Sequence, residues 1–167
     1  MIETPVLYIF SGLPGSGKTT LSQHLSRHFG IAHLRIDTIE QALRDLCGID
    51  VEGEGYRLAY RIAADNLNLG LSVIADSCNP VALTRREWED VAKNQDAAFI
   101  NIEVICTDLA EHRRRVETRE NSVPALKLPT WEEVMLREYH SWDTARITVD
   151  TAGRSASESF SQLCALL

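Results

Sequence analysis

No apolar run in the chain approaches the roughly 18 residues that a membrane-spanning helix needs. The N-terminal stretch contains Glu3 and Pro5 and has no basic region, so no secretory signal is visible. The four cysteines, at positions 47, 78, 106 and 164, form no CxxC pair and no zinc-binding spacing. These absences argue against a membrane protein or a disulfide-stabilised secreted domain, and they predict a cytoplasmic protein with reduced thiols.

Basic residues are also few, because 17 Lys and Arg stand against 24 Asp and Glu and give a formal charge of −7. Such a chain lacks the basic footprint of duplex nucleic-acid binders, so nucleic acid is not the expected partner. Hydrophobic residues at 44% and charged residues at 25% are typical of a globular protein. The length of 167 residues predicts one domain that spans residues 1–167.

Short apolar runs alternate with amphipathic or polar segments along the chain. The runs predict strands at 5–11, 31–37, 71–76, 97–106 and 146–150. The segments between and after them predict helices at 18–29, 38–46, 56–69, 81–95, 109–120, 131–141 and 156–167. Strands separated by helices indicate an α/β fold with a five-stranded parallel sheet and helices on both faces. Right-handed crossovers then bring the carboxyl ends of the strands to one edge, where ligands bind.

The segment Gly12-Leu13-Pro14-Gly15-Ser16-Gly17-Lys18-Thr19 fits the pattern G-x-x-x-x-G-K-[ST] in full. It follows a predicted strand and opens a predicted helix, as a phosphate-binding loop requires. Glycines let the backbone amides point at phosphate oxygens, and the helix N-terminus adds partial positive charge. Lys18 then reaches the β and γ phosphates, and the Thr19 hydroxyl ligates Mg²⁺. The motif predicts a nucleoside triphosphate site formed by Gly12, Pro14, Gly15, Ser16, Gly17, Lys18, Thr19 and Thr20.

With this loop, four further motifs resemble the kinase-like AAA-type family of P-loop proteins. The motifs are GLPGSGKTT at 12–20, RIDTIEQALR at 35–44, VIADSCNP at 73–80, HRRRVETR at 112–119 and VDTAG at 149–153. Similar small kinases include polynucleotide 5′-kinase domains, chloramphenicol phosphotransferase, and gluconate, shikimate and adenylyl-sulfate kinases. The resemblance implies a three-layer P-loop fold with strand order 2-3-1-4-5 and a short lid over about residues 111–130.

The resemblance also implies roles for two carboxylates. Asp37 is expected to end the second strand, where similar kinases place the base that accepts the proton of the acceptor hydroxyl. The alternative for Asp37 is a cap of the following helix. Asp76 ends the third strand after an apolar run, as in a Walker B segment, and would hold Mg²⁺ through water. In similar kinases the D-x-x-N turn instead contacts the acceptor, which makes Asp76 and Asn79 candidate substrate residues; the alternative for Asp76 is a turn before Pro80.

Arginines of the expected lid helix are candidates for the nucleotide side of the site. Arg115 and Arg119 are four residues apart and would share a helix face. In similar kinases one lid arginine contacts the transferring phosphoryl group and another lies on the nucleotide, which suggests Arg119 and Arg115 respectively. The alternative is a solvated, salt-bridged face, because Glu111 stands four residues before Arg115. Gly153, after the fifth strand, occupies the turn that runs beside adenine in the family.

One departure from the family pattern concerns the acceptor. Many relatives carry Arg three residues after the catalytic Asp, and here that position is Glu40. Arg44 replaces this cation only in part, so the resemblance implies a neutral or cationic acceptor. The expected activity is ATP- and Mg²⁺-dependent transfer of the γ-phosphoryl group to a hydroxyl of a small molecule. The alternatives are a 5′-hydroxyl kinase acting on nucleic acid and a non-enzymatic nucleotide-binding module.

Overall fold

The structure is a computed structural model that describes residues 4–167. Within that range the strands are β1 (Val6–Ser11), β2 (Ala32–Arg35), β3 (Val73–Asp76), β4 (Ala98–Ile105) and β5 (Ile147–Asp150). The helices are α1 (Lys18–Phe29), α2 (Ile36–Cys47), α3 (Glu54–Asn68), α4 (Ala82–Lys93), α5 (Leu109–Thr118), α6 (Trp131–Met135) and α7 (Ala156–Leu166). Strands and helices alternate much as the apolar pattern predicts.

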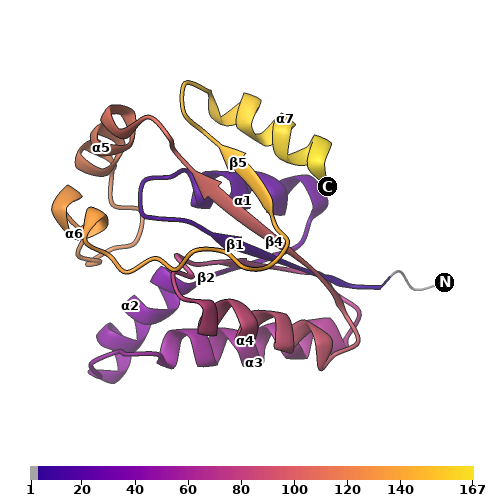
Figure 1. Cartoon of the computed structure of the whole chain (residues 1–167). Coiled ribbons are helices and arrows are strands. Elements are labelled where there is room, and N and C mark those ends of the chain that lie inside the picture. Colours follow the sequence, from indigo (N-terminus) through magenta and orange to yellow (C-terminus); the bar gives the residue numbers. More distant parts are fainter. Residues whose placement is uncertain (1–3) are drawn as a thin grey trace.

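The strands form one parallel sheet in the order β2-β3-β1-β4-β5 (Figure 1). The α/β class and the order 2-3-1-4-5 expected from the sequence are therefore confirmed. In a parallel sheet all carboxyl ends of the strands share one edge. Figure 1 shows α5 and α6 at that edge and the C-terminal end of α7 on the opposite side of the molecule.

Helices cover both faces of the sheet and give it three layers (Figure 1). On one face, α1 and α7 enclose a core of Phe10, Leu21, Leu25, Ile74, Ile102, Val104, Val149 and Leu163. On the other face, α2, α3 and α4 enclose a core of Leu7, Ile9, Ile36, Ala59, Ala63, Leu67, Val73, Ala75, Trp88 and Ala92. Burial on both faces explains why the central strands are continuous apolar runs.

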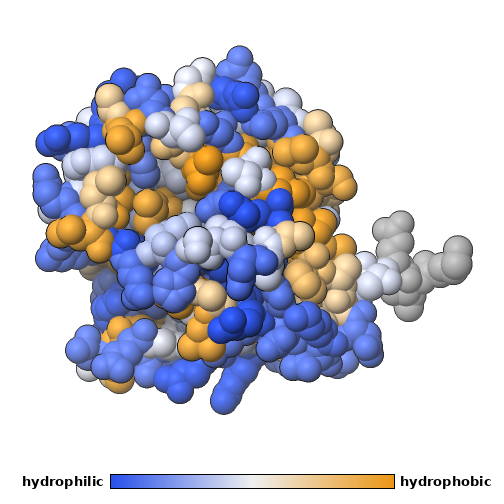
Figure 2. Space-filling view, in the orientation of Figure 1, coloured by the Kyte–Doolittle hydropathy of each residue, from blue (hydrophilic) through white to orange (hydrophobic). Residues whose placement is uncertain are grey.

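The surface is mainly polar. Hydrophilic residues prevail on the face shown in Figure 2, and the hydrophobic residues there form patches among them. The largest side chains with under 2% exposure, led by Trp88 and Phe10, lie in the two cores instead. Among the helices within residues 4–167, none has both the length and the apolar character needed to cross a membrane.

The expectation that Asp37 ends a strand is wrong. β2 stops at Arg35, and α2 begins at Ile36, so Asp37 lies in the first turn of a helix. Ile36 is 3% exposed and packs in the core with residues of α3. This packing favours a helix that begins at Ile36. A carboxylate in a first turn also interacts favourably with the helix dipole. The cap position belongs to Arg35, and within the described chain no side chain caps α2, so Asp37 is not a cap either.

The helix predicted over 131–141 is much shorter in the structure. α6 ends at Met135, and the chain then runs without regular structure toward β5. Arg85 provides the reason, because its guanidinium donates to the His140 carbonyl (3.0 Å) and lies 4.0 Å from the centre of the Trp142 ring. These contacts hold the chain around His140 and Trp142 against Arg85 of α4, so packing overrides the local helical pattern there.

Candidate active site

The loop between β1 and α1 carries the predicted phosphate-binding motif. α1 begins at Lys18 directly after Gly17, and its first turn contains no acidic residue. The unpaired amides and the partial positive charge of its N-terminus therefore remain available to an anion. Lys18 is only 9% exposed, so its charge is held largely inside the protein. This combination suits a chain of phosphate groups.

A cavity of about 450 Å³ opens beside this loop. Its walls come from the start of α1, the end of β2, the start of α2, the segment around the end of α5, and the turn after β5. Seven ionisable residues line it, five basic and two acidic, which leaves an excess of three positive charges in a chain of net charge −7. The basic residues are Lys18, Arg35, Arg115, Arg119 and Arg154, and the acidic ones are Asp37 and Glu120. The cavity therefore attracts anions.

Many of the predicted site residues meet in this cavity. They are Gly15, Gly17, Lys18, Thr19, Thr20, Asp37, Arg115 and Arg119. Arg119 follows the last residue of α5 in an extended conformation, rather than continuing the helix as the sequence predicted. Burial lowers the pKa of the Arg119 guanidinium, and the charge of Asp37 opposes that effect in part. The buried Nε of Arg119 has no hydrogen-bond partner among residues 4–167, so no internal acceptor fixes this side of the guanidinium.

Asp76 lies beneath the loop at the end of β3, with a side chain only 1% exposed. Its Oδ2 is 3.3 Å from Nε2 of His33, and neither carboxylate oxygen has a hydrogen-bond donor in the described part of the chain. Burial raises the pKa of the Asp76 carboxyl, but the His33 ring and the charge of Lys18 outweigh burial and hold the pKa below its usual value. A buried, ionised carboxylate with unused oxygens near Thr19 fits a Mg²⁺ ligand set.

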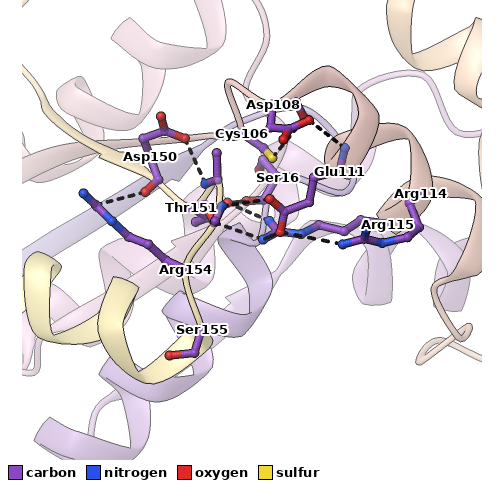
Figure 3. Close-up of polar contacts among 12 residues, drawn as sticks. Ser16, Cys106, Asp108, Glu111, Arg114, Arg115, Asp150, Thr151, Arg154 and Ser155 are labelled. Carbon is purple, nitrogen blue, oxygen red and sulfur yellow. Dashed lines mark hydrogen bonds and ion pairs between the residues drawn. The ribbon is translucent and has the colours of Figure 1, made fainter.

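A hydrogen-bonded network connects the phosphate-binding loop, α5 and the turn after β5 (Figure 3). The Thr151 hydroxyl donates to the carbonyl oxygen of Ser16 at 2.7 Å and accepts from Nη1 of Arg115 at 2.7 Å. Arg115 Nη2 also donates to Glu111 at 2.6 Å, and the amide of Gly153 donates to the other oxygen of Glu111 at 2.8 Å. The Glu111–Arg115 pair is therefore part of the site rather than an isolated pair on a solvated helix face.

The helix α5 also packs directly on the phosphate-binding loop. The ring of His112, 4% exposed, donates from Nε2 to the carbonyl oxygen of Pro14 at 2.9 Å and meets the Trp131 ring edge-on at 5.2 Å. A Cβ at Gly15 would lie 2.6 Å from a methyl group of Val116, and φ at Gly15 is +82°. Glycine is thus required at this position both by the backbone conformation and by the approach of the helix.

Other predicted residues lie outside the lining of the cavity. Arg44 pairs with Glu40 at 3.5 Å on α2. The side chain of Asn79 is fully buried and donates to the Ser11 hydroxyl at 2.9 Å, so in this conformation it stabilises the turn after β3. Gly153 is engaged by Glu111, as described above. Gly12, Pro14 and Ser16 are loop residues that do not line the cavity. At Gly12 there is no room for a side chain, because a Cβ would lie 2.3 Å from the Val104 carbonyl oxygen.

The sequence analysis missed Arg35 and Ser122, and it did not foresee the central place of Thr151. Arg35 lines the cavity at the end of β2, and its Nη1 donates to the Ser122 hydroxyl at 2.9 Å. One signal was present, namely a basic residue within the strand predicted over 31–37, two residues before the candidate base. Nothing in the local sequence marks Ser122, because its contact joins segments 87 residues apart.

Comparison with known proteins agrees with this architecture. A family model described as an AAA domain matches residues 7–136. The chain is 26% identical to the cytidylate kinase of Methanopyrus kandleri, with 100% of this chain and 95% of that protein covered.

Solved structures share the fold at lower identity. The APS kinase of Mycobacterium tuberculosis, in complex with AMPPNP and APS, has a TM-score of 0.66 at 18% identity, over 98% of this chain and 97% of that one. A gluconokinase from Sinorhizobium meliloti has a TM-score of 0.67 at 13% identity, over 98% of this chain and 94% of that one. The resemblance to small P-loop kinases expected from the sequence is confirmed, and the chain belongs to the AAA domain family as a P-loop kinase-like domain.

Proposed function

We propose that this protein binds Mg²⁺–ATP at the loop between β1 and α1 and transfers the γ-phosphoryl group to a hydroxyl group of a small molecule. The observation that carries the proposal is one cavity lined by Lys18, Asp37 and Arg119 together. Each of the three suits a separate task in phosphoryl transfer, and their elements are distant in the sequence. Membership of the AAA domain family and the similarity to cytidylate kinase support an ATP-dependent kinase.

The cationic residues act on the phosphate chain. Lys18 and the amides at the start of α1 bind the phosphates, and Arg119 stabilises the charge that develops on the transferring group. An arginine in that role contributes about 10³–10⁵ to the rate of a P-loop enzyme. Thr19 and Asp76 would hold Mg²⁺, which when bound neutralises charge on the β and γ phosphates.

Asp37 acts on the acceptor. Its side chain is 48% exposed within the cavity, so a hydroxyl group can approach it. The acceptor oxygen forms a bond to the γ phosphorus while the bond from phosphorus to the β–γ bridging oxygen breaks and ADP leaves. The hydroxyl proton passes to the Asp37 carboxylate. General base catalysis of this kind contributes about 10²–10⁴ to the rate.

The size of the cavity favours a small acceptor over a nucleic acid. About 450 Å³ lies within the range of small-molecule pockets. A nucleic-acid end kinase needs in addition a basic groove along the strand, and the net charge of −7 argues against one. A non-enzymatic module would give no reason for a carboxylate beside the phosphate site.

The test is incubation with Mg²⁺ and γ-labelled ATP, with three acceptor sets in parallel. The sets are small alcohols and sugars, 5′-hydroxyl oligonucleotides, and cytidine monophosphate. We expect label on a small-molecule hydroxyl. Label on the oligonucleotide would favour the nucleic-acid kinase. Label on the phosphate of cytidine monophosphate would show a phosphate acceptor and contradict the role of Asp37 as a base. Binding of ATP without transfer to any set would support the non-enzymatic module.

A further inference from the structure

Arg35 occupies the acceptor side of the cavity, next to the candidate base. It is the last residue of β2, its side chain is 17% exposed, and its Nη2 lies 3.9 Å from Oδ2 of Asp37. Its Nη1 donates to the Ser122 hydroxyl at 2.9 Å. Its Nε is buried and has no acceptor within residues 4–167. A mostly buried guanidinium thus lines the cavity with only a neutral hydroxyl and a distant carboxylate as its partners.

The pairing with Asp37 leaves most of the Arg35 charge uncompensated. At 3.9 Å the pair is at the long limit of an ion pair, and Asp37 is itself about half exposed, so the attraction is weak. A mostly buried cation without a close counter-charge is costly, and an anionic ligand removes that cost. The planar fork of a guanidinium matches the oxygens of a carboxylate, phosphate or sulfate group.

The nucleotide or a protein partner already accounts for each of the other basic residues of the cavity. Lys18 and Arg119 act on the phosphate chain in the proposed function. Arg115 is held by Glu111 and by Thr151, as described above. Arg154 donates to the Asp150 carbonyl oxygen and contacts Gln162. For Arg35, no phosphate of the nucleotide is assigned as a partner, and its one carboxylate partner within the described chain, Asp37, lies at 3.9 Å.

Glu40 does not lie where a neutral or cationic acceptor would require it. The sequence predicts such an acceptor because the negative charge of Glu40 would repel an anionic group bound next to it. Glu40 does not line the cavity. Its carboxylate pairs with Arg44, and its Cγ would lie 2.3 Å from a Cβ at Gly55, so the side chain is directed toward the start of α3. The carboxylate of Glu40 therefore does not repel an anionic group that binds between Arg35 and Asp37.

We infer that the acceptor carries an anionic group, a carboxylate, phosphate or sulfate, which Arg35 binds beside the hydroxyl that Asp37 orients. This inference rests on the proposed hydroxyl kinase activity for its place in the reaction, and on the geometry of Arg35 for the binding site itself. Arg35 is a specificity-determining residue in this account, since it selects the acceptor and takes no part in the transfer.

The kinetic test uses acceptor pairs that share a skeleton and differ in charge: gluconate against glucose, glycerol 3-phosphate against glycerol, and adenylyl sulfate against adenosine. The readout is kcat/KM for label transfer from γ-labelled ATP. The wild-type protein should prefer the anionic member of at least one pair, and the pair identifies the anion. Arg35→Gln should lower that preference about tenfold, mainly through KM, and Arg35→Lys should restore part of it. Equal use of neutral and anionic members by the wild type would overturn the inference.

A binding test decides the inference even if no acceptor in the pairs is phosphorylated. The protein is saturated with Mg²⁺–AMPPNP, which fills the nucleotide part of the cavity, and inorganic phosphate is titrated at constant ionic strength with calorimetric detection. Arg35→Gln should bind phosphate about tenfold more weakly than the wild type. The exposed Arg86, on α4 and outside the cavity, provides the matched control Arg86→Gln, which should bind as the wild type does. Equal phosphate binding by Arg35→Gln and the wild type overturns the inference, whereas absence of label transfer with Arg35-dependent binding overturns only the proposed function.

Discussion

Replacement of Thr151 by Val tests whether the network in Figure 3 holds the phosphate-binding loop in place. Val has nearly the same shape as Thr and removes only the hydroxyl. Thr151 is 4% exposed, and its hydroxyl donates to the carbonyl oxygen of Ser16 at 2.7 Å, a residue that is itself 1% exposed. The variant therefore leaves a buried carbonyl of the loop without its side-chain donor.

The expected cost follows from that unpaired acceptor. A buried polar group that loses its partner costs about 1–3 kcal/mol. In a protein of this size each kcal/mol lowers the Tm by about 2–4 °C, so Thr151→Val should melt about 2–12 °C below the wild type. Arg115 keeps its bonds to Glu111 and to the Thr151 carbonyl oxygen, at 2.6 and 3.0 Å, so α5 should stay in place.

The assay combines thermal unfolding, with and without Mg²⁺–ATP, and calorimetric titration of ATP. Because the Ser16 peptide is freed, ATP should bind about fivefold to tenfold more weakly. Thr148, exposed on β5 just before this turn, provides the matched control, and Thr148→Val should change neither quantity. If Thr151→Val matched the control in both Tm and ATP affinity, the proposed link between the turn after β5 and the loop would be wrong.

Three further predictions concern backbone, packing and pH. Gly15→Ala should lower stability and ATP affinity more than Gly48→Ala does. Both glycines have positive φ, but only a Cβ at Gly15 would meet a side chain, that of Val116 at 2.6 Å. Equal losses of the two variants in unfolding and in ATP titrations would contradict this reasoning. Arg85→Met should lower the free energy of unfolding in urea by about 2–4 kcal/mol, because the lost guanidinium leaves several carbonyl oxygens without that donor. The control Arg86→Met, at an exposed position, should lower it by under about 0.5 kcal/mol. Similar urea midpoints for the two variants would refute the role of Arg85 in holding the chain after Met135. The folded-state pKa of Asp76 lies below that of the unfolded chain, so its carboxylate stabilises the fold above about pH 4 and loses that contribution as the pH falls through the folded pKa. In EDTA, the Tm of Asp76→Asn should therefore fall less steeply with acidification than the Tm of the wild type. Parallel curves of Tm against pH would contradict the lowered pKa.

The fold could be predicted from the sequence because local signals agree with the tertiary structure at most positions. Apolar runs became β1, β3 and β4, and the phosphate-binding motif lies between β1 and α1 as its mechanism requires. The failures have a common physical cause, which is packing between distant segments. Ile36 enters the core and starts α2 before Asp37, and Arg85 draws the chain after Met135 out of a helix. Neither contact has a signature in its own neighbourhood.

The site divides in the same way. The loop residues, Asp37 and Arg119 could be predicted, because motif order and the carboxyl edge of a parallel sheet bring them together. Arg35 and its contact with Ser122 could not, since they depend on how the segment after α5 folds back over β2. The direction of the Glu40 side chain, toward Arg44 and the start of α3 and away from the cavity, could not be read from its sequence position. Contacts across long sequence separations are therefore the part of this site that only the structure supplies.

We propose that Asp37 serves the transfer step and not the binding of ATP. The most direct measurement compares wild type and Asp37→Asn at saturating Mg²⁺–ATP, with the acceptor that takes the most label, and determines the ATP dissociation constant of each protein. We expect transfer to fall by about 10²–10⁴ while the dissociation constant changes less than about twofold. Transfer at the wild-type rate by Asp37→Asn, or loss of ATP binding in step with the loss of transfer, would contradict it.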